Sequence, residues 1–286
     1  MKKRPKLPPW IRVRVGTGNG RTETAQILSD LKLNTVCGSA ECPNLSECWL
    51  KRTATFMILG NECTRNCRFC AVQHSSKPLP PENDEPDRIA IAVKKMNLKY
   101  VVITSVTRDD LPDGGATHFS KTISAIRNSM PDIKIEVLTP DYLDENLQIV
   151  LNANPAVFNH NVETPERLSK EIRIKANYRR SLQTLAEAAK FSNGSIKIKS
   201  GLMVGMGETD DEVETAIKDI RQAGATMLTI GQYLPPSGNH WSLERFVHPD
   251  TFEQWRLFAL NEGFDKVASA PLVRSSYHAE ELNENP

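Results

Sequence analysis

All six cysteines of the chain lie between residues 37 and 70, in two groups of three. Three and then two residues separate the members of the second group, Cys63, Cys67 and Cys70. Four and then five residues separate the members of the first group, Cys37, Cys42 and Cys48. In a reducing compartment, cysteines clustered in this way more often bind metal than form disulfides. The sequence therefore indicates metal chemistry within the first 70 residues.

The Cys63 group fits an iron–sulfur cluster better than zinc. A structural zinc site needs four ligands, usually in two closely spaced pairs of cysteine or histidine, whereas this loop offers three. A [4Fe–4S] cluster bound by three cysteines leaves one iron open for a ligand from outside the protein. S-adenosylmethionine can fill that position through its amino and carboxylate groups. The spacing thus predicts a [4Fe–4S] cluster with one open iron, with zinc as the alternative.

The composition is that of a soluble globular protein, and 286 residues suffice to bury a large core. The 36 Lys and Arg residues balance the 35 Asp and Glu residues, so no general signature of nucleic-acid binding is present. No apolar run approaches the roughly 20 residues that span a bilayer, and the N-terminus lacks the apolar core of a secretory signal. We therefore expect a cytoplasmic protein that binds neither nucleic acid nor a membrane.

Strand and helix patterns alternate along the rest of the chain. Continuous apolar strands are expected at residues 55–59, 100–105, 133–138, 156–161, 196–202 and 226–230. Helices are expected at residues 21–33, 86–97, 119–130, 144–151, 178–191, 209–224 and 249–261. One helix has a clear start and stop, because Thr209 and Glu212 form a capping box and Gly224 ends the pattern.

Six strands that alternate with helices predict a parallel sheet covered on both sides. Six units are too few for the usual eight-stranded barrel, which leaves a partial barrel or a doubly wound sheet. In either case the site lies at the carboxyl ends of the strands, and the Cys63 loop follows the first strand directly. We expect an N-terminal extension with the Cys37 group at residues 1–52, a core at 53–262 and a C-terminal extension at 263–286.

The CX3CX2C loop after the first strand resembles the radical SAM superfamily, whose usual aromatic residue before the third cysteine is Phe69 here. The CX4CX5C group upstream is similar to that of one of its families, the lipoyl synthases. Further motifs similar to that family are RDDLPDGGA at 108–116, NVET at 161–164, ANYRRS at 176–181, KSGLMVGMGET at 199–209, QYLPPS at 232–237 and RSSYHA at 274–279. The resemblance covers residues 10–279 and implies an α/β fold, a partial (β/α)6 barrel of the TIM type.

Two departures from the family pattern are modest. The residues after Cys37, Gly-Ser-Ala-Glu, stand where the family more often has acidic residues, and Thr107 stands where Asp is frequent. Neither departure affects a ligand, so the activity implied by the resemblance is unchanged.

The resemblance implies two [4Fe–4S] clusters. The Cys63 group would bind the cluster that cleaves S-adenosylmethionine, and the Cys37 group an auxiliary cluster whose fourth ligand is Ser275, with Ser276 as the nearby alternative. A serine oxygen is a harder and weaker ligand for iron than a thiolate, so this corner of the cluster can open. The auxiliary cluster would then be the source of two sulfur atoms. They are inserted at C6 and C8 of a protein-bound octanoyl chain to make the lipoyl cofactor.

The polar and glycine residues near the strand ends are the candidates for S-adenosylmethionine binding. The loop of Gly114 and Gly115 resembles the segment that receives the methionyl amine, and glycine at Gly205 lets the backbone approach the adenosine. The other polar residues that we expect around the ligand are Arg108, Asn161, Glu163 and Arg179. Simpler interpretations remain open: a helix start at Gly114 and Gly115, a βα turn at Gly205, and surface salt bridges for the polar side chains. The histidines receive no role, because a radical abstraction needs no general base.

The resemblance also implies partners. They are octanoylated lipoyl-carrier domains of 2-oxoacid dehydrogenase E2 subunits and of the glycine cleavage H protein, a flavodoxin- or ferredoxin-type electron donor, and an iron–sulfur carrier protein. The basic residues within 2–14 could bind an acidic carrier domain, with a solvated tail as the competing interpretation. The alternative activity is that of a methylthiotransferase, another two-cluster radical enzyme. We expect the chain to lack room for the additional domains of such an enzyme.

Overall fold

The structure is a computed structural model that describes residues 6–12, 19–40, 42–51 and 53–283. Lys2, Lys3, Arg4 and Arg14 of the basic N-terminal segment lie outside the described residues. The chain divides into two compact units. The N-terminal unit comprises Val13–Arg65 and Val72–Phe158, and the C-terminal unit comprises Asn159–Pro286 with Met1–Arg12 and Asn66–Ala71.

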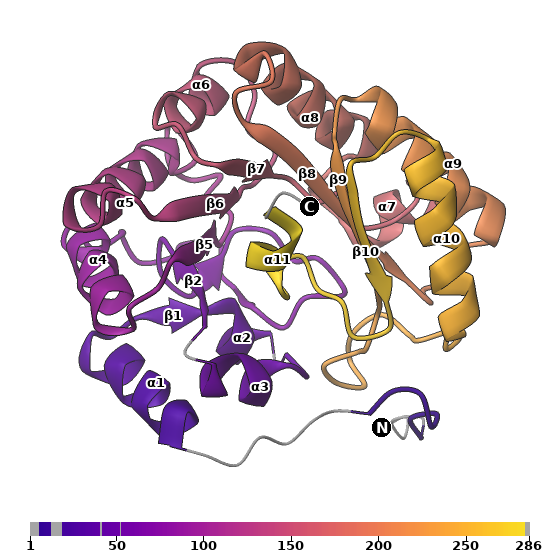
Figure 1. Cartoon of the computed structure of the whole chain (residues 1–286), viewed down its shortest axis with the longest axis horizontal. Coiled ribbons are helices and arrows are strands. Elements are labelled where there is room, and N and C mark those ends of the chain that lie inside the picture. The colour runs from indigo at the N-terminus through magenta and orange to yellow at the C-terminus, as the bar shows by residue number, and fades with distance from the viewer. Residues whose placement is uncertain (1–5, 13–18, 41, 52, 284–286) are drawn as a thin grey trace. The chain divides into compact units, whose positions relative to one another are not determined.

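The N-terminal unit is built on a parallel sheet. Its strands β2 (Thr55–Ile58), β5 (Tyr100–Ser105) and β6 (Lys134–Leu138) are hydrogen-bonded in this order, and the short β1 (Asn34–Thr35) pairs antiparallel with β2. Helices α4 (Glu85–Lys95), α5 (Ala116–Ser129) and α6 (Asp144–Asn152) lie along the outer side of the sheet, and α1 (Asn19–Asp30) comes before it in the chain (Figure 1). Every residue of β2 is buried, as expected for a parallel strand that is covered on both faces.

The C-terminal unit repeats this pattern. Its strands β8 (Lys197–Val204), β9 (Met227–Gln232) and β10 (Lys266–Ala270) are parallel and hydrogen-bonded in this order. Helices α8 (Tyr178–Ser192), α9 (Asp210–Gln222) and α10 (Pro249–Asn261) lie on the outer side of these strands (Figure 1). Strand β7 (Val157–Asn159) spans the boundary of the units, α7 (Glu166–Ile172) follows it, and α11 (Ala279–Asn283) contacts β10.

The predicted alternation of strands and helices is confirmed, and so is the α/β class. The capping box is present: Glu212 N–H donates to the Thr209 hydroxyl at 3.3 Å, and Thr209 N–H donates to the Glu212 carboxylate at 2.9 Å. The prediction that the last strand ends near residue 230 is wrong, because β10 adds a further parallel strand beside β9. Its sequence, KVASA, has small side chains that are only partly buried, so it shows no apolar run.

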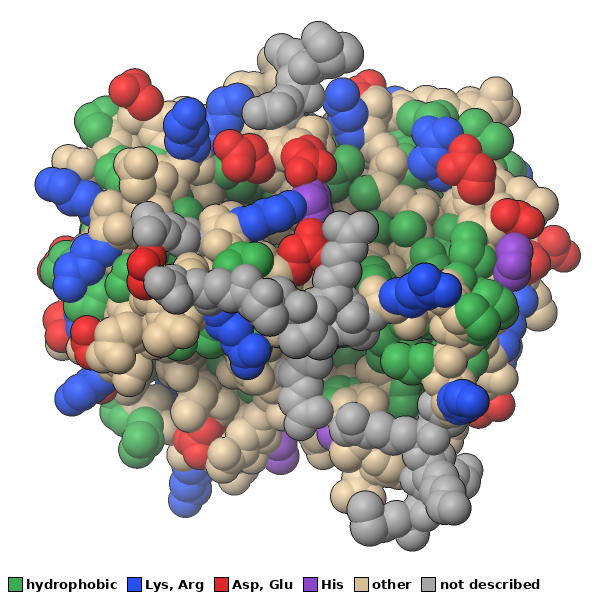
Figure 2. Space-filling model, turned by 60° about the horizontal axis from the view of Figure 1, so that its bottom comes forward, with side chains coloured by type: hydrophobic (Ala, Val, Ile, Leu, Met, Phe, Trp, Pro, Cys, Tyr) green, Lys and Arg blue, Asp and Glu red, His purple; other side chains and the backbone are tan. Residues whose placement is uncertain are grey.

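The surface carries both signs of charge. Figure 2 shows Lys and Arg side chains interspersed with Asp and Glu side chains over the face that it presents. Within the described part of the chain, no helix has both the length and the apolar character that crossing a membrane requires.

Candidate functional site

Cys63 ends the short strand β3 (Glu62–Cys63), which pairs in parallel with β4 (Gln73–His74). Its sulfur accepts hydrogen bonds from the backbone N–H groups of Arg65, at 3.4 Å, and Thr107, at 3.3 Å. Such donors stabilise negative charge on sulfur, as a metal-binding thiolate needs. Thr107 follows β5, so the loops after β2 and β5 meet at the carboxyl ends of neighbouring strands, where the sequence analysis expects the site.

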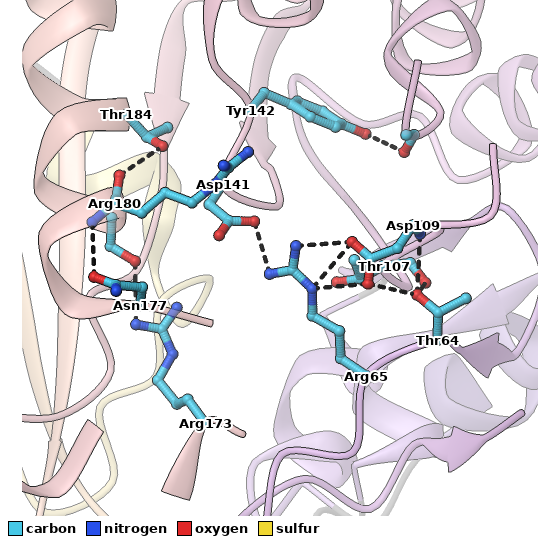
Figure 3. Close-up of polar contacts among 12 residues, drawn as sticks. Thr64, Arg65, Thr107, Asp109, Asp141, Tyr142, Arg173, Asn177, Arg180 and Thr184 are labelled. Atoms are coloured by element: carbon cyan, nitrogen blue, oxygen red, sulfur yellow. Dashed lines mark hydrogen bonds and ion pairs between the residues drawn. The ribbon is translucent and has the colours of Figure 1, made fainter. Parts of the chain in front are cut away.

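Arg65 ties this loop to two acidic side chains (Figure 3). Its Nη2 donates to Asp109 Oδ1 at 2.9 Å, and its Nη1 lies 2.7 Å from Asp141 Oδ1. The side chain of Asp141 is 2% exposed and that of Arg65 13%, so this ion pair is shielded from water. The Thr64 hydroxyl adds a hydrogen bond to Asp109 at 2.9 Å. These contacts fix the two residues that directly follow Cys63.

Cys67 and Cys70 lie on a turn that a 3.0 Å hydrogen bond closes, from the N–H of Cys70 to the carbonyl of Cys67. Arg68 anchors this turn: its N–H donates to the carbonyl of Ile172 at 2.8 Å, and its guanidinium lies 4.5 Å from the centre of the Trp241 ring. Backbone and cation–π contacts together therefore hold the loop between the two cysteines.

An apolar cluster lies beside this turn. Phe69 packs against the buried cluster formed by Leu168, Ile172, Met206 and Tyr233. Burial, and after it the charge of Cys70, raises the pKa of the Tyr233 hydroxyl above its usual value. One side of this turn therefore packs against buried apolar side chains.

The Cys37 group lies on and between the short helices α2 (Val36–Ser39) and α3 (Leu45–Leu50). The N–H of Cys42 donates to the carbonyl of Cys37 at 3.1 Å. Burial raises the pKa of the Cys37 thiol. Burial is also the main cause that raises the pKa of the Cys48 thiol to about 12, and the charges of Cys37 and Cys42 add to it.

Both groups suit iron–sulfur clusters by the chemistry of their donors. All six cysteines are free thiols. In the ranges that the structure describes, no three His, Cys, Asp or Glu side chains converge on a position for a single metal ion. The ligands of a [4Fe–4S] cluster need not converge on one point, because each binds a different iron. Three soft thiol donors in each group therefore fit such a cluster.

The structure brings Ser275, Asn161 and Glu163 together in the C-terminal unit. Nδ2 of Asn161 donates to Oγ of Ser275 at 2.7 Å and to Oε1 of Glu163 at 3.1 Å. Glu163 has a φ of +71°, and its N–H donates to the carbonyl of Gly201 in β8 at 3.0 Å. Burial raises the pKa of Glu163, while the charge of Arg173 and the Asn161 hydrogen bond oppose that rise. A left-handed φ at a residue with a side chain is a conformation that its surroundings impose.

Gly205 begins the loop after β8 with a φ of +97°, and a Cβ there would lie 2.5 Å from the carbonyl oxygen of Arg245. Only glycine fits both conditions. The N–H groups of Gly205 and Met206 donate to the two carboxylate oxygens of the buried Glu208, at 2.6 and 2.8 Å. The backbone is therefore held in a fixed conformation at the carboxyl end of β8.

Gly114 and Gly115 form the start of α5, with Gly115 as the residue before its first turn. Asp113 accepts the N–H of Gly115 at 2.9 Å, and the Tyr142 hydroxyl donates to the carbonyl of Gly114 at 2.7 Å. The structure therefore confirms the helix start at this loop, and contact with S-adenosylmethionine stays a prediction.

Two of the expected polar residues are engaged in ion pairs. The buried Arg108 donates to Asp110 at 2.7 Å and to the carbonyl of Leu59 at 3.2 Å. Arg179 is exposed and pairs with Glu166 at 2.6 Å. Arg179 therefore forms the surface salt bridge that the simpler interpretation expects, whereas the ion pair of Arg108 involves a buried guanidinium.

Sequence reasoning gave no role to Asp141 or Lys199. Lys199 is fully buried in β8 and donates to the carbonyl of Ser275 at 2.6 Å. Strand β8 also contains Lys197 and Ser200, so its sequence did not single out Lys199. Asp141 gave no signal either, because its partner Arg65 is distant in sequence.

Comparisons with known proteins decide the family. The model of the radical SAM superfamily matches residues 57–220. The lipoyl synthase of Chlorobium limicola is 50% identical over 283 residues, which cover 98% of this chain and 96% of that protein. The lipoyl synthase of Caldicellulosiruptor saccharolyticus is 50% identical over 278 residues, which cover 96% and 97%. The chain belongs to the lipoyl synthase family.

Solved structures show the fold of this lipoyl synthase family member. Methylornithine synthase (PylB) matches with a TM-score of 0.55 at 13% identity, over 95% of this chain and 90% of its own. The hydrogenase maturase HydG from Carboxydothermus hydrogenoformans matches with a TM-score of 0.56 at 14% identity, over 93% and 78%. At such identity the likeness concerns the fold alone, and it confirms the partial (β/α)6 barrel. Family membership makes the chain a sulfur-inserting enzyme that depends on S-adenosylmethionine and a [4Fe–4S] cluster.

Proposed function

We propose that this member of the lipoyl synthase family inserts two sulfur atoms, at C6 and C8, into a protein-bound octanoyl-lysine and so makes the lipoyl cofactor. The observation that carries the proposal is the presence of two separate groups of three free thiols, at Cys63 and at Cys37. A single cluster suffices to cleave S-adenosylmethionine. The second group accounts for a second cluster that donates sulfur.

The ligands are assigned as follows. Cys63, Cys67 and Cys70 would hold the cluster that binds S-adenosylmethionine, and the auxiliary cluster would be held by Cys37, Cys42, Cys48 and Ser275. When bound, the clusters and S-adenosylmethionine supply the hydrogen-abstracting radical and the sulfur atoms. Residues 1–52 and 263–286 are proposed as extensions that serve the auxiliary cluster, around a core at 53–262.

The protein's own residues would orient the cysteine ligands and shield them from water. The N–H groups of Arg65 and Thr107 orient the Cys63 sulfur, at 3.4 and 3.3 Å. Phe69 and the apolar cluster beside it keep water from the neighbourhood of Cys70. Neither orienting a ligand nor excluding water requires a proton transfer, so the proposal assigns no role to a histidine.

S-adenosylmethionine is proposed to contact five residues: Gly114, Gly115, Asn161, Glu163 and Gly205. Carboxylate and amide oxygens accept hydrogen bonds from hydroxyl groups, so Asn161 and Glu163 suit the ribose. The fixed backbone at Gly205 suits close approach of the adenosine, because no side chain intervenes.

The proposed substrate is an octanoylated lipoyl-carrier domain, from 2-oxoacid dehydrogenase E2 subunits or the glycine cleavage H protein. Two further partners follow from the chemistry. Cleavage of S-adenosylmethionine needs an electron, which a flavodoxin- or ferredoxin-type protein would supply. Loss of sulfur needs replacement, for which an iron–sulfur carrier protein would serve.

The test is an anaerobic reaction of the reconstituted protein with an octanoyl-lysyl peptide, S-adenosylmethionine and a reductant, followed by mass spectrometry. We expect the peptide to gain two sulfur atoms and to lose the corresponding hydrogens. Release of 5′-deoxyadenosine without sulfur in the peptide would refute the substrate and product proposed here. A Ser275→Ala variant tests the ligand assignment, because it should still bind the auxiliary cluster but with one iron in an altered environment.

A further inference from the structure

Lys199 fixes the backbone of Ser275. Its side chain is 0% exposed in the middle of β8. Burying an ammonium group is costly unless hydrogen bonds compensate for the lost water. Nζ donates to the carbonyl oxygen of Ser275 at 2.6 Å, a charge-assisted bond between residues 76 positions apart. The sheet therefore holds the main chain of the C-terminal segment at this residue.

Asn161 fixes the hydroxyl of the same serine. Its Nδ2 lies 2.7 Å from Oγ of Ser275, and its Oδ1 lies 3.0 Å from that oxygen. A hydroxyl can donate one hydrogen bond and accept others. The amide of Asn161 can therefore donate to the Ser275 hydroxyl through Nδ2 or accept from it through Oδ1. The same Nδ2 is 3.1 Å from Oε1 of Glu163. One amide therefore contacts both Ser275 and Glu163.

Gly201 leaves the space in which these side chains meet. A Cβ at this position would lie 2.7 Å from Oδ1 of Asn161, 2.8 Å from Oγ1 of Thr229 and 3.0 Å from Oγ of Ser275. Real Cβ atoms do not approach polar atoms so closely, so a larger residue would displace them. The sequence of β8 is thus adapted to the position of Ser275 at two residues, Lys199 and Gly201.

We propose that Asn161 and Lys199 are positioning residues for Ser275, which hold its oxygen in place before the auxiliary cluster binds. This inference rests on the proposed role of Ser275 as an iron ligand. If iron takes the place of the hydroxyl proton, which would pass to solvent, Nδ2 of Asn161 can continue to donate to the oxygen, while the ammonium of Lys199 still holds the carbonyl. A ligand that is preorganised in this way loses less freedom on binding than a free chain terminus would.

The same amide also connects the two proposed sites. Glu163 is a proposed contact of S-adenosylmethionine, and Asn161 contacts its carboxylate. A change at Asn161 is therefore expected to alter S-adenosylmethionine binding as well as the position of Ser275, whereas the side chain of Lys199 holds the carbonyl of Ser275.

The test uses the full chain with Cys63, Cys67 and Cys70 all changed to Ala, so that only the auxiliary cluster forms on anaerobic reconstitution. Lys199→Met and Asn161→Leu are introduced into this protein. Lys197→Met is the matched control, because Lys197 also lies in β8 and donates to a backbone carbonyl, that of Asn283, at 3.0 Å. Ser275→Ala supplies the reference for a cluster without its serine ligand.

Mössbauer spectroscopy measures the iron with an oxygen ligand, and a chelator measures how fast iron is lost. We expect Lys199→Met and Asn161→Leu to reduce the oxygen-ligated signal and to speed the loss of iron about fivefold, the effect of one lost hydrogen bond. Lys197→Met should match the parent. Circular dichroism checks that each variant is folded. If Asn161→Leu is unfolded, Asn161→Ser takes its place, and if Lys199→Met is unfolded, Lys199→Gln takes its place.

Parent-like spectra and rates in the folded variants of both residues would overturn the inference. The proposed function would survive that result, provided that the wild-type protein holds two clusters and inserts sulfur. A wild-type protein that holds one cluster and inserts none would instead refute the proposed function.

Discussion

At the scale of single residues, the two cysteine groups are treated differently by their surroundings. The Cys63 sulfur receives two backbone N–H groups, which fix its position. The Cys48 thiol is partly buried beside two other thiols, and its pKa is raised to about 12. The backbone thus orients Cys63, whereas iron binding at Cys48 must release a proton that this thiol holds more firmly than a free cysteine does. Two environments of this kind agree with two clusters of different function.

Loss of one cysteine should have a different effect in each group. We expect Cys42→Ala to abolish sulfur insertion into an octanoyl-lysyl peptide while cleavage of S-adenosylmethionine persists, because only the sulfur-donating cluster loses a ligand. Cys67→Ala should abolish both. Chromatography of 5′-deoxyadenosine and mass spectrometry of the peptide measure the two activities in one reaction. Equal loss of both activities in Cys42→Ala would contradict this division of labour.

The Arg65 ion pairs offer a second residue-scale prediction. Asp141 is almost fully buried and Asp109 is 40% exposed, yet both pair with the same guanidinium. Removing the buried carboxylate leaves Arg65 with the more exposed Asp109 of these two partners, so Asp141→Asn should lower the free energy of unfolding of the metal-free protein by about 3 kcal/mol. Asp109→Asn, the control, should lower it by about 1 kcal/mol. Urea denaturation measures both, and a larger effect of Asp109→Asn would refute the argument.

At the scale of elements, the periodicity of apolar residues predicts the bounds of helices and strands that bury a continuous face. Strand β5 and helix α10 have the predicted bounds, and α9 begins at its predicted cap. Periodicity failed for β10, whose small side chains are partly buried, and for α2 and α3, which are too short to show a period. The contacts of Ser275 with Asn161 and Lys199 were equally out of reach, because they join residues 114 and 76 positions apart.

The start of α9 provides a prediction about pH. The hydrogen bond from Arg167 is the main cause that lowers the pKa of Glu212 from 4.5 to about 2, and burial partly opposes it. A carboxylate with a lowered pKa in the folded state stabilises the fold above the unfolded value, and this contribution is lost as the pH falls through the folded value. Glu212→Gln should therefore destabilise the metal-free protein at neutral pH, with a difference from wild type that shrinks between pH 4.5 and about 2.

Urea denaturation over that pH range measures the difference. Thr209→Ala removes the other half of the capping box and serves as the control. Its cost of about 1 kcal/mol should depend on pH less than that of Glu212→Gln, because the Thr209 hydroxyl is only a minor cause of the lowered pKa of Glu212. A Glu212→Gln difference that is constant with pH would exclude the carboxylate as its source.

At the scale of the whole molecule, the proposed ligands run from Cys37 to Ser275, so most of the chain lies between the first and the last of them. Clusters that bind the folded chain and not the unfolded chain stabilise it by mass action. The reconstituted protein should therefore melt at a higher temperature than the metal-free protein. The variant with Cys63, Cys67 and Cys70 changed to Ala should gain only part of that increase.

Iron and sulfide analysis measures how many clusters each sample holds. Two [4Fe–4S] clusters correspond to about eight irons and eight sulfides per chain, and removal of the Cys63 group should leave about four of each. Anaerobic calorimetry on the same samples then relates each loss of iron to a loss of melting temperature. One zinc without sulfide would contradict the two-cluster proposal. Full iron content without any rise in melting temperature would contradict the coupling of the clusters to folding.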